Sequence, residues 1–223
     1  MKSLFRLKER IICKKKFLHY FPEGFSDEKY YSWERGYKWE AHLAWKNALN
    51  KQEYDLLLSE ENYSEISLRA VRLETKTNLL FSFEKMALRD AIKSHEGAKA
   101  FSEGLYEYVY GKHSFQKRFE NFSDVLNLLP RKQTRVSTWP LQTVFGFIAN
   151  PKENIFLKPR VTQIAAKRYK YEFNYHSKPN WETYKSLLDF AAQIKKDTAD
   201  LKPKDFIDLQ SFIWVLGSEE YAH

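Results

Sequence analysis

The chain has 223 residues and a net charge of +8, with 43% hydrophobic and 30% charged residues. These proportions exclude a disordered chain, and the length suits one large domain. The single cysteine, Cys13, excludes an intrachain disulfide and a thiolate metal site, which favours a cytoplasmic protein. No apolar run approaches the roughly 18 residues that a membrane span needs, so we expect none.

Helical spacing of apolar residues dominates the first half of the sequence. The first 21 residues predict a helix lying on the body of the protein through Leu4, Leu7, Ile11 and Leu18. Asp27 is suited to cap a second helix, with Glu34 and Lys38 as an i,i+4 pair on its surface. Its apolar stripe would contain Tyr30, Trp33, Tyr37, Ala41, Ala44 and Ala48. A helical stretch over 62–93 follows, broken near 77–78, and its apolar half contains Leu79, Leu80, Phe83, Ala87 and Ala91. A short helix ended by Gly111 comes next.

The second half begins with the clearest helix, which Ser114 caps and Pro130 ends. A polar connector over 131–138 leads to a helix from Pro140 to Ala149. Short strands are expected at 155–157 and 171–175, with a helix over 161–169 between them. Asn180 caps the next helix, and Pro203 opens a last one that is apolar on nearly all faces. Such a helix belongs in the middle of a core.

The fold class that follows is mainly α. We expect a single compact helical domain over 1–223, with a small two-stranded β element near residues 154–175 and a weak sub-boundary near 130–138. Glycine and proline number only seven each, which argues against a sheet-rich fold with many tight turns.

Several short strings together resemble an uncharacterised bacterial protein family over most of the chain. They include Phe-Pro-Glu-Gly-Phe at 21–25, Glu-Arg-Gly-Tyr-Lys-Trp at 34–39, Pro-Arg-Lys-Gln-Thr-Arg at 130–135 and Ile-Asp-Leu-Gln-Ser-Phe-Ile-Trp at 207–214. The resemblance implies a bacterial, cytoplasmic origin. That family has no assigned activity, so the resemblance carries over no functional residues.

Positive charge is concentrated in one part of the sequence, which we call the basic window, residues 131–170. It holds nine Lys or Arg and one acid, Glu153, so its net charge of 9 − 1 = +8 equals that of the whole chain. A local excess of one sign attracts polyanions. The window contains Arg131, Lys132, Arg135, Lys152, Lys158, Arg160, Lys167, Arg168 and Lys170.

This pattern predicts a nucleic-acid-binding protein, with DNA or RNA as partner. Lys and Arg would neutralise phosphates, and exposed aromatic residues would stack on bases. The expected binding residues are Arg131, Lys132, Arg135, Lys158, Arg160, Lys167, Arg168 and Trp139, with Phe156 and Tyr169 as further stacking residues if exposed.

The same cationic cluster would also suit a small phosphorylated or carboxylated ligand. Two other functions stay open. An enzyme would use a pocket of acids and arginines around Glu74, Glu84, Asp205 and Asp208, and a protein-interaction module would bind an acidic partner. Standard catalytic and phosphate-binding motifs are absent, and no two of the six histidines lie within four residues of each other. No catalytic residue is assigned, and we expect neither a cofactor nor a metal site.

Overall fold

The computed structural model describes residues 2–132 and 134–222, and every regular element in them is a helix. In chain order the elements are α1 (Lys2–Tyr20), η1 (Gly24–Ser26), α2 (Glu28–Tyr30), η2 (Tyr31–Arg35), α3 (Gly36–Ala48), α4 (Lys51–Ser59), α5 (Tyr63–Glu74), α6 (Ser82–Ala91), α7 (His95–Tyr110), α8 (Phe115–Leu128), α9 (Trp139–Ala149), α10 (Pro159–Tyr169), α11 (Trp181–Asp197), η3 (Ala199–Leu201), α12 (Phe206–Gly217) and η4 (Glu219–Tyr221).

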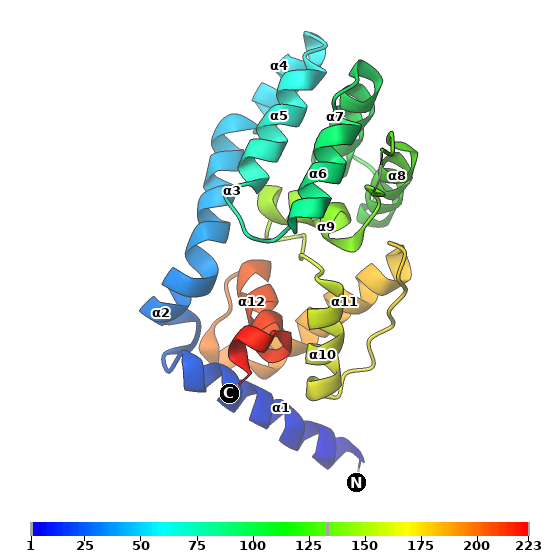
Figure 1. Ribbon diagram of the computed structural model, residues 1–223. Coiled ribbons are helices and arrows are strands. Elements are labelled where there is room, and N and C mark those ends of the chain that lie inside the picture. The colour runs from blue at the N-terminus through cyan, green and yellow to red at the C-terminus, as the bar shows by residue number, and fades with distance from the viewer. Residues whose placement is uncertain (1, 133, 223) are drawn as a thin grey trace.

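The helices form two halves, which Figure 1 shows one above the other. Helices α4 to α9 lie in the upper half, and α1, α10, α11 and α12 lie in the lower half, while α3 rises along one side. One cluster of buried apolar side chains includes residues of both halves. Helices α9 and α12 are buried on almost all faces, which confirms the prediction for the last helix.

Local sequence signals set the helix ends as predicted. The side chains of Asp27, Ser114 and Asn180 each accept hydrogen bonds from backbone N–H groups in the first turn of the following helix. The predicted break in the stretch over 62–93 separates α5 from α6. Among the described helices, none combines the length and apolar character that crossing a membrane requires.

The predicted β element is wrong, because the described residues contain no strand. The two segments are extended, but side chains of neighbouring helices satisfy backbone groups that a strand partner would otherwise bind. Ile155 N donates to the Tyr184 hydroxyl at 3.0 Å, and Leu157 N donates to Thr143 Oγ1 at 3.0 Å. In the second segment, Asn174 N donates to the Ser186 hydroxyl at 3.0 Å.

Helix α1 lies across the lower end of the molecule (Figure 1), but through a different face from the one predicted. Cys13 and Phe17 are buried, whereas Leu7 and Ile11 are about half exposed. The side chain of Leu4 lies outside the described residues. Cys13 and Phe17 are also four apart, so the spacing alone did not decide which face meets the body.

Helices α10 and α12 cross at close range, and Gly217 makes the crossing possible. A Cβ atom at Gly217 would lie 2.0 Å from the carbonyl oxygen of Val161. A backbone atom cannot move aside as a side chain can, so the two helices would have to separate.

We therefore expect Gly217→Ala to lower the free energy of unfolding by about 1–3 kcal/mol, the usual cost of overpacking a core. Chemical denaturation measures this loss. Gly104→Ala is the matched control: its Cβ would meet only side-chain atoms of Val125, the nearest at 2.8 Å. Alanine also has the higher helix propensity there, so the control should lose less. Equal losses in the two variants would contradict the close crossing.

Candidate functional site

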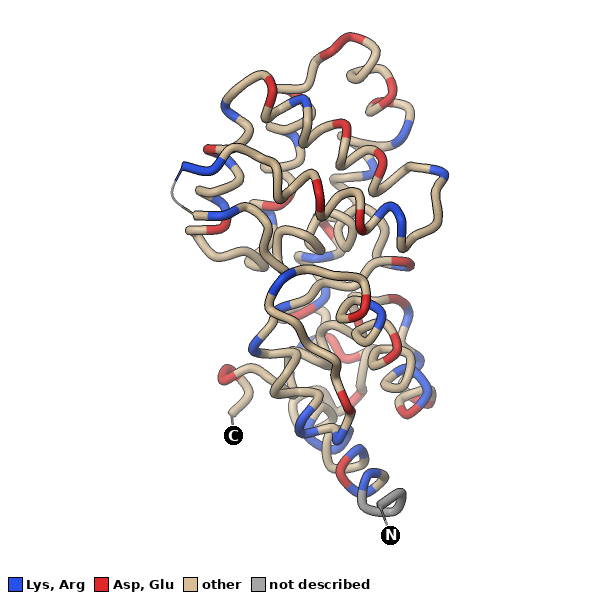
Figure 2. Tube along the Cα trace, turned by 90° about the vertical axis from the view of Figure 1, so that its right-hand side faces the viewer, with Lys and Arg blue, Asp and Glu red and all other residues tan. Residues whose placement is uncertain are grey.

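The basic window does not form one uninterrupted cationic face. Figure 2 shows Lys and Arg mixed with Asp and Glu over both halves of the molecule. Lys158 is only 9% exposed, so its assignment to phosphate binding is wrong. Its Nζ donates to the carbonyl oxygen of Leu79 at 2.8 Å and lies 3.5 Å from the centre of the Phe81 ring. Lys158 is therefore part of the packing between the N-terminus of α10 and the α5–α6 connection.

The aromatic residues expected to stack on bases are also buried. Trp139 is 2% exposed, and its Nε1 donates to the carbonyl oxygen of His176 at 2.8 Å. Phe156 and Tyr169 are buried as well, and the Tyr169 hydroxyl donates to Asp197. These three side chains are core residues. The assignment of Trp139 to base stacking is therefore wrong, and Phe156 and Tyr169 do not meet the condition of exposure on which theirs depended.

The other predicted cations separate into two groups. Arg160 belongs to neither group and forms a surface ion pair of 2.9 Å with Glu219. Lys167 and Arg168, at the end of α10, line a groove that α1 completes. The remaining group is exposed on the loop between α8 and α9, and it consists of Arg131, Lys132 and Arg135.

The structure places exposed apolar side chains beside this loop, which the sequence did not reveal. Phe81, Phe83 and Met86, at the start of α6, are 55%, 49% and 60% exposed. The two rings stack, with centroids 5.6 Å apart and planes at 24°. Phe83, Met86 and Lys132 line one shallow hollow of about 90 Å³.

Phe83 is expected in the apolar half of the 62–93 stretch from its helical spacing, and its exposure is thus a correction. Helical spacing could not reveal this arrangement, because Phe81 precedes α6 with an extended backbone and its ring stacks on that of Phe83.

Below this surface lies a buried acid–base cluster of Glu74, Glu84, Lys85 and Lys158. Glu74 and Glu84, two of the acids considered for an enzyme pocket, are only 2% and 3% exposed. Lys85 Nζ is 3.4 Å from Glu74, and Lys158 Nζ is 4.0 Å from Glu84. Glu84 also accepts from the backbone N–H of Phe81 at 2.9 Å, so it holds the start of α6.

Burial shifts the pKa values of Glu74, Glu84 and Lys158, in each case away from the charged form. It raises the pKa of Glu74 against the opposing charge of Lys85. It likewise raises the pKa of Glu84, where the Phe81 N–H and Lys158 oppose it. Burial lowers the pKa of Lys158, although Glu84 and Glu74 favour its charge.

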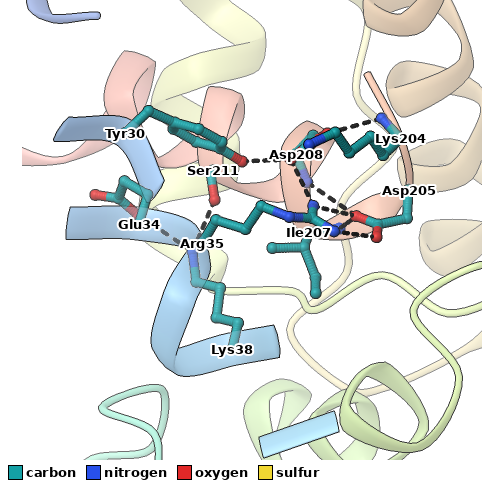
Figure 3. Close-up of polar contacts among 9 residues, drawn as sticks. All are labelled: Tyr30, Glu34, Arg35, Lys38, Lys204, Asp205, Ile207, Asp208 and Ser211. Carbon is teal, nitrogen blue, oxygen red and sulfur yellow. Dashed lines mark hydrogen bonds and ion pairs between the residues drawn. The ribbon is translucent and has the colours of Figure 1, made fainter. Parts of the chain in front are cut away.

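A second buried network joins η2 to the start of α12 (Figure 3). The guanidinium of Arg35 donates to both carboxylate oxygens of Asp205, at 2.9 and 2.7 Å, and to Asp208 at 2.6 Å. Asp208 also accepts from the Tyr30 hydroxyl at 2.6 Å and from the backbone N–H of Lys204 at 2.7 Å. The network therefore satisfies a fully buried carboxylate.

The π-helical turn η2 explains why this network was not predicted. The predicted pair of Glu34 and Lys38 is present, with Lys38 Nζ 3.2 Å from Glu34, but it is buried rather than on the surface. The wider turn changes the register, so that Glu34 and Arg35 face the core while Trp33 is 54% exposed. Lys38 also donates to the Ser211 hydroxyl at 2.8 Å.

The acids considered for an enzyme are divided between these two networks. Glu74 and Glu84 belong to one, Asp205 and Asp208 to the other, and each has its own cations. The part of the chain that the structure describes holds no group of three or more His, Cys, Asp or Glu placed to bind a metal ion. Burial raises the pKa of Cys13 to about 11, which makes it a poor nucleophile at neutral pH.

The chain matches no protein-family model, no curated protein and no solved structure. The geometry of its own residues therefore carries the functional argument.

The Arg35 network should be worth several kcal/mol. Arg35→Met leaves two buried carboxylates without their cation, and we expect a loss of about 3–5 kcal/mol in unfolding free energy. Arg69→Met is the control, because Arg69 also bridges two acids, Glu53 and Glu65, but is partly exposed. Its loss should be about 1 kcal/mol or less, as for surface pairs. Urea denaturation of both variants measures the difference, and similar losses would argue against the network.

The acid–base cluster predicts a pH dependence. Glu74 and Glu84 have folded-state pKa values above their ordinary value of 4.5, so the folded state binds their protons more tightly than the unfolded state. Their contribution to stability is complete below pH 4.5 and is lost as the pH rises through the folded pKa values. The variant Glu74→Gln/Glu84→Gln should lose less stability over this range than the unmodified protein.

Denaturation midpoints measured across that pH range test this prediction. Glu60→Gln/Glu61→Gln changes two exposed acids in the same way and should give a profile parallel to that of the unmodified protein. A parallel profile for the Glu74/Glu84 variant as well would show that the cluster does not contribute.

Proposed function

We propose that the protein binds single-stranded nucleic acid on the surface formed by the start of α6 and the α8–α9 loop. We call this the α6–loop surface, and it consists of Phe81, Phe83, Met86, Arg131, Lys132 and Arg135. The observation that carries the proposal is that a half-exposed, stacked phenylalanine pair adjoins a lysine of the exposed basic loop.

Exposed aromatic rings beside cations are the usual platform for single strands, because every base has a flat face that stacks on a ring. The Phe81 ring is held in place, since Lys158 lies against it and Phe83 stacks with it. About half of the Phe83 side chain remains open to solvent. A base stacked on Phe83 would gain contact area at little cost in side-chain ordering.

The charges of the loop suit phosphate groups. Arg131, Lys132 and Arg135 lie within five consecutive positions, and all three are exposed. Asp90 lines the same hollow as Lys132, but its carboxylate accepts a hydrogen bond from Lys93 at 2.9 Å. The other nearby acid, Glu84, is buried. A strand that stacks on Phe83 would therefore meet a surface of net positive charge. A cytoplasmic location, as the lone cysteine favours, would give access to both DNA and RNA.

Fluorescence anisotropy with labelled single- and double-stranded oligonucleotides across a salt series tests the proposal. Each phosphate contact of a single strand contributes a slope of about 0.7 in log affinity against log salt. Arg131→Glu/Lys132→Glu/Arg135→Glu should therefore reduce the slope by about 2. Phe83→Ala should weaken binding by about 1–3 kcal/mol, the value of one base stack, without changing the slope.

The matched control is Lys46→Glu/Lys112→Glu/Lys117→Glu, which changes the same charge at exposed positions away from the surface. This control should keep the salt slope of the unmodified protein, and adding Phe83→Ala to it should weaken binding as much as in the unmodified protein. The proposal is rejected if no oligonucleotide binds at low salt, or if binding is equal in the loop variant and this control. Tighter binding of duplex than of single strands would reject the stacking role.

A further inference from the structure

A second cationic feature lies in the lower half of the molecule, between α1 and α10. We call it the α1–α10 groove, and its volume is about 470 Å³. Four cations, Lys16, Lys167, Arg168 and Lys170, line it together with one acid, Glu9. Lys16 is about 150 positions away from the others in the sequence, so the fold alone brings these charges together.

Three of these cations, Lys16, Lys167 and Arg168, differ from the neighbouring cations Arg10 and Lys14 of α1, which have acidic partners. Arg10 pairs with Asp197 at 3.3 Å, and Lys14 pairs with Asp200 at 2.5 Å. Within the described ranges 2–132 and 134–222, no ion pair involves Lys16, Lys167 or Arg168. The groove thus gathers like charges that the protein itself does not neutralise.

The like charges are close enough to oppose one another. Burial, and then the positive charge of Arg168, lower the pKa of Lys16. Arg168 cannot turn away freely, because its Nη1 donates to the carbonyl oxygen of Leu216 near the end of α12. An anion between Lys16 and Arg168 would replace repulsion with two attractive contacts.

Lys170 extends this arrangement from the end of α10. Its φ of +55° lies in the left-handed region, where glycine is the least strained residue. The residue that caps the end of α10 is thus a lysine, at a position where glycine would be less strained, and that lysine lines the groove.

The walls of the groove are apolar as well as cationic. Ile12 is 57% exposed, and the partly buried Ile164 contributes aliphatic surface from α10. No aromatic side chain is among the residues that line the groove in the described structure. The site therefore combines a place for an anion with a place for an aliphatic or aryl group, within a volume typical of small-ligand sites.

We infer that the α1–α10 groove binds a phosphoryl group attached to an apolar body. The phosphoryl oxygens would accept from Lys16, Lys167 and Arg168, and the apolar body would lie against Ile12 and Ile164. A phosphomonoester dianion matches these three cations, which share the groove with the single acid Glu9, better than a single negative charge does. Such a group can come from a free phosphorylated molecule or from the headgroup of an anionic lipid. The inference is independent of the α6–loop surface.

Calorimetric titration of the full chain with phenyl phosphate and with inorganic phosphate tests the site. Phenyl phosphate should bind at least about tenfold more tightly than inorganic phosphate, because only the ester carries an apolar group. Lys16→Gln/Lys167→Gln should weaken phenyl phosphate binding by about tenfold or more. Lys8→Gln/Lys15→Gln removes the same charge from exposed positions of α1 and should leave the affinity within about twofold.

A second experiment, with lipid vesicles, distinguishes a free phosphorylated molecule from the headgroup of an anionic lipid. Phosphatidylcholine vesicles with and without phosphatidic acid are sedimented with the unmodified protein and with both lysine variants. Sedimentation that needs phosphatidic acid and is lost only in Lys16→Gln/Lys167→Gln supports the lipid source, and phenyl phosphate binding supports the free source. Circular dichroism melting confirms folding, and the single variant Lys167→Gln replaces the double variant if the latter is unfolded.

The inference is overturned if neither phenyl phosphate nor phosphatidic acid vesicles bind at low salt. It is also overturned if the groove variant and the Lys8/Lys15 control bind equally. Because neither probe contains a nucleobase and neither variant touches the α6–loop surface, this result and the oligonucleotide result can fail separately.

Discussion

The lower half of the structure depends on the guanidinium of Arg35. Helix α12 is buried on nearly all faces, yet its first turn contains Asp208, whose side chain is completely buried. A carboxylate in that position would cost several kcal/mol without a cation and further hydrogen bonds. Arg35 supplies the cation and holds Asp205, which in turn caps α12 by accepting from the backbone N–H of Ile207. Since α12 packs against α1, α10 and α11, the position of this one ion network determines where the rest of the lower half can lie.

The parts of the fold that the sequence predicted are those set by local chemistry. Caps at Asp27, Ser114 and Asn180 depend on a short polar side chain and the turn that follows it, and both are visible in the sequence. The β element failed for the opposite reason. Residues 155–157 are as apolar as a buried strand, but the hydroxyls of Tyr184 and Thr143 satisfy their N–H groups. These partners come from other helices, so the sequence around residues 155–157 does not predict them.

The candidate site also combines features that the local sequence reveals with features that depend on residues distant in the sequence. Counting charges over residues 131–170 identified the exposed loop correctly but could not show which cations face inward. Lys158 follows a buried apolar run and ends beside Glu84, which lies 74 positions earlier in the sequence. The exposed Phe81 and Phe83 result from the same packing, because Glu84 and Lys158 fix the start of α6 with these rings pointing outward. A cation wrongly expected to bind phosphate thus supports the surface proposed to bind it.

The two cationic surfaces differ in a way that net charge cannot reveal. A chain with a charge of +8 attracts any polyanion at low salt, so the net charge does not distinguish the two surfaces. Short-range contacts distinguish them. The α6–loop surface is open and carries aromatic rings, which suits a polymer whose bases can stack in succession. The α1–α10 groove is a larger hollow, of about 470 Å³ against about 90 Å³, with aliphatic rather than aromatic side chains beside its cations. It suits one phosphoryl group with an apolar substituent but offers no ring on which bases could stack. The chemistry beside the cations, rather than the number of cations, therefore determines which anion each surface selects.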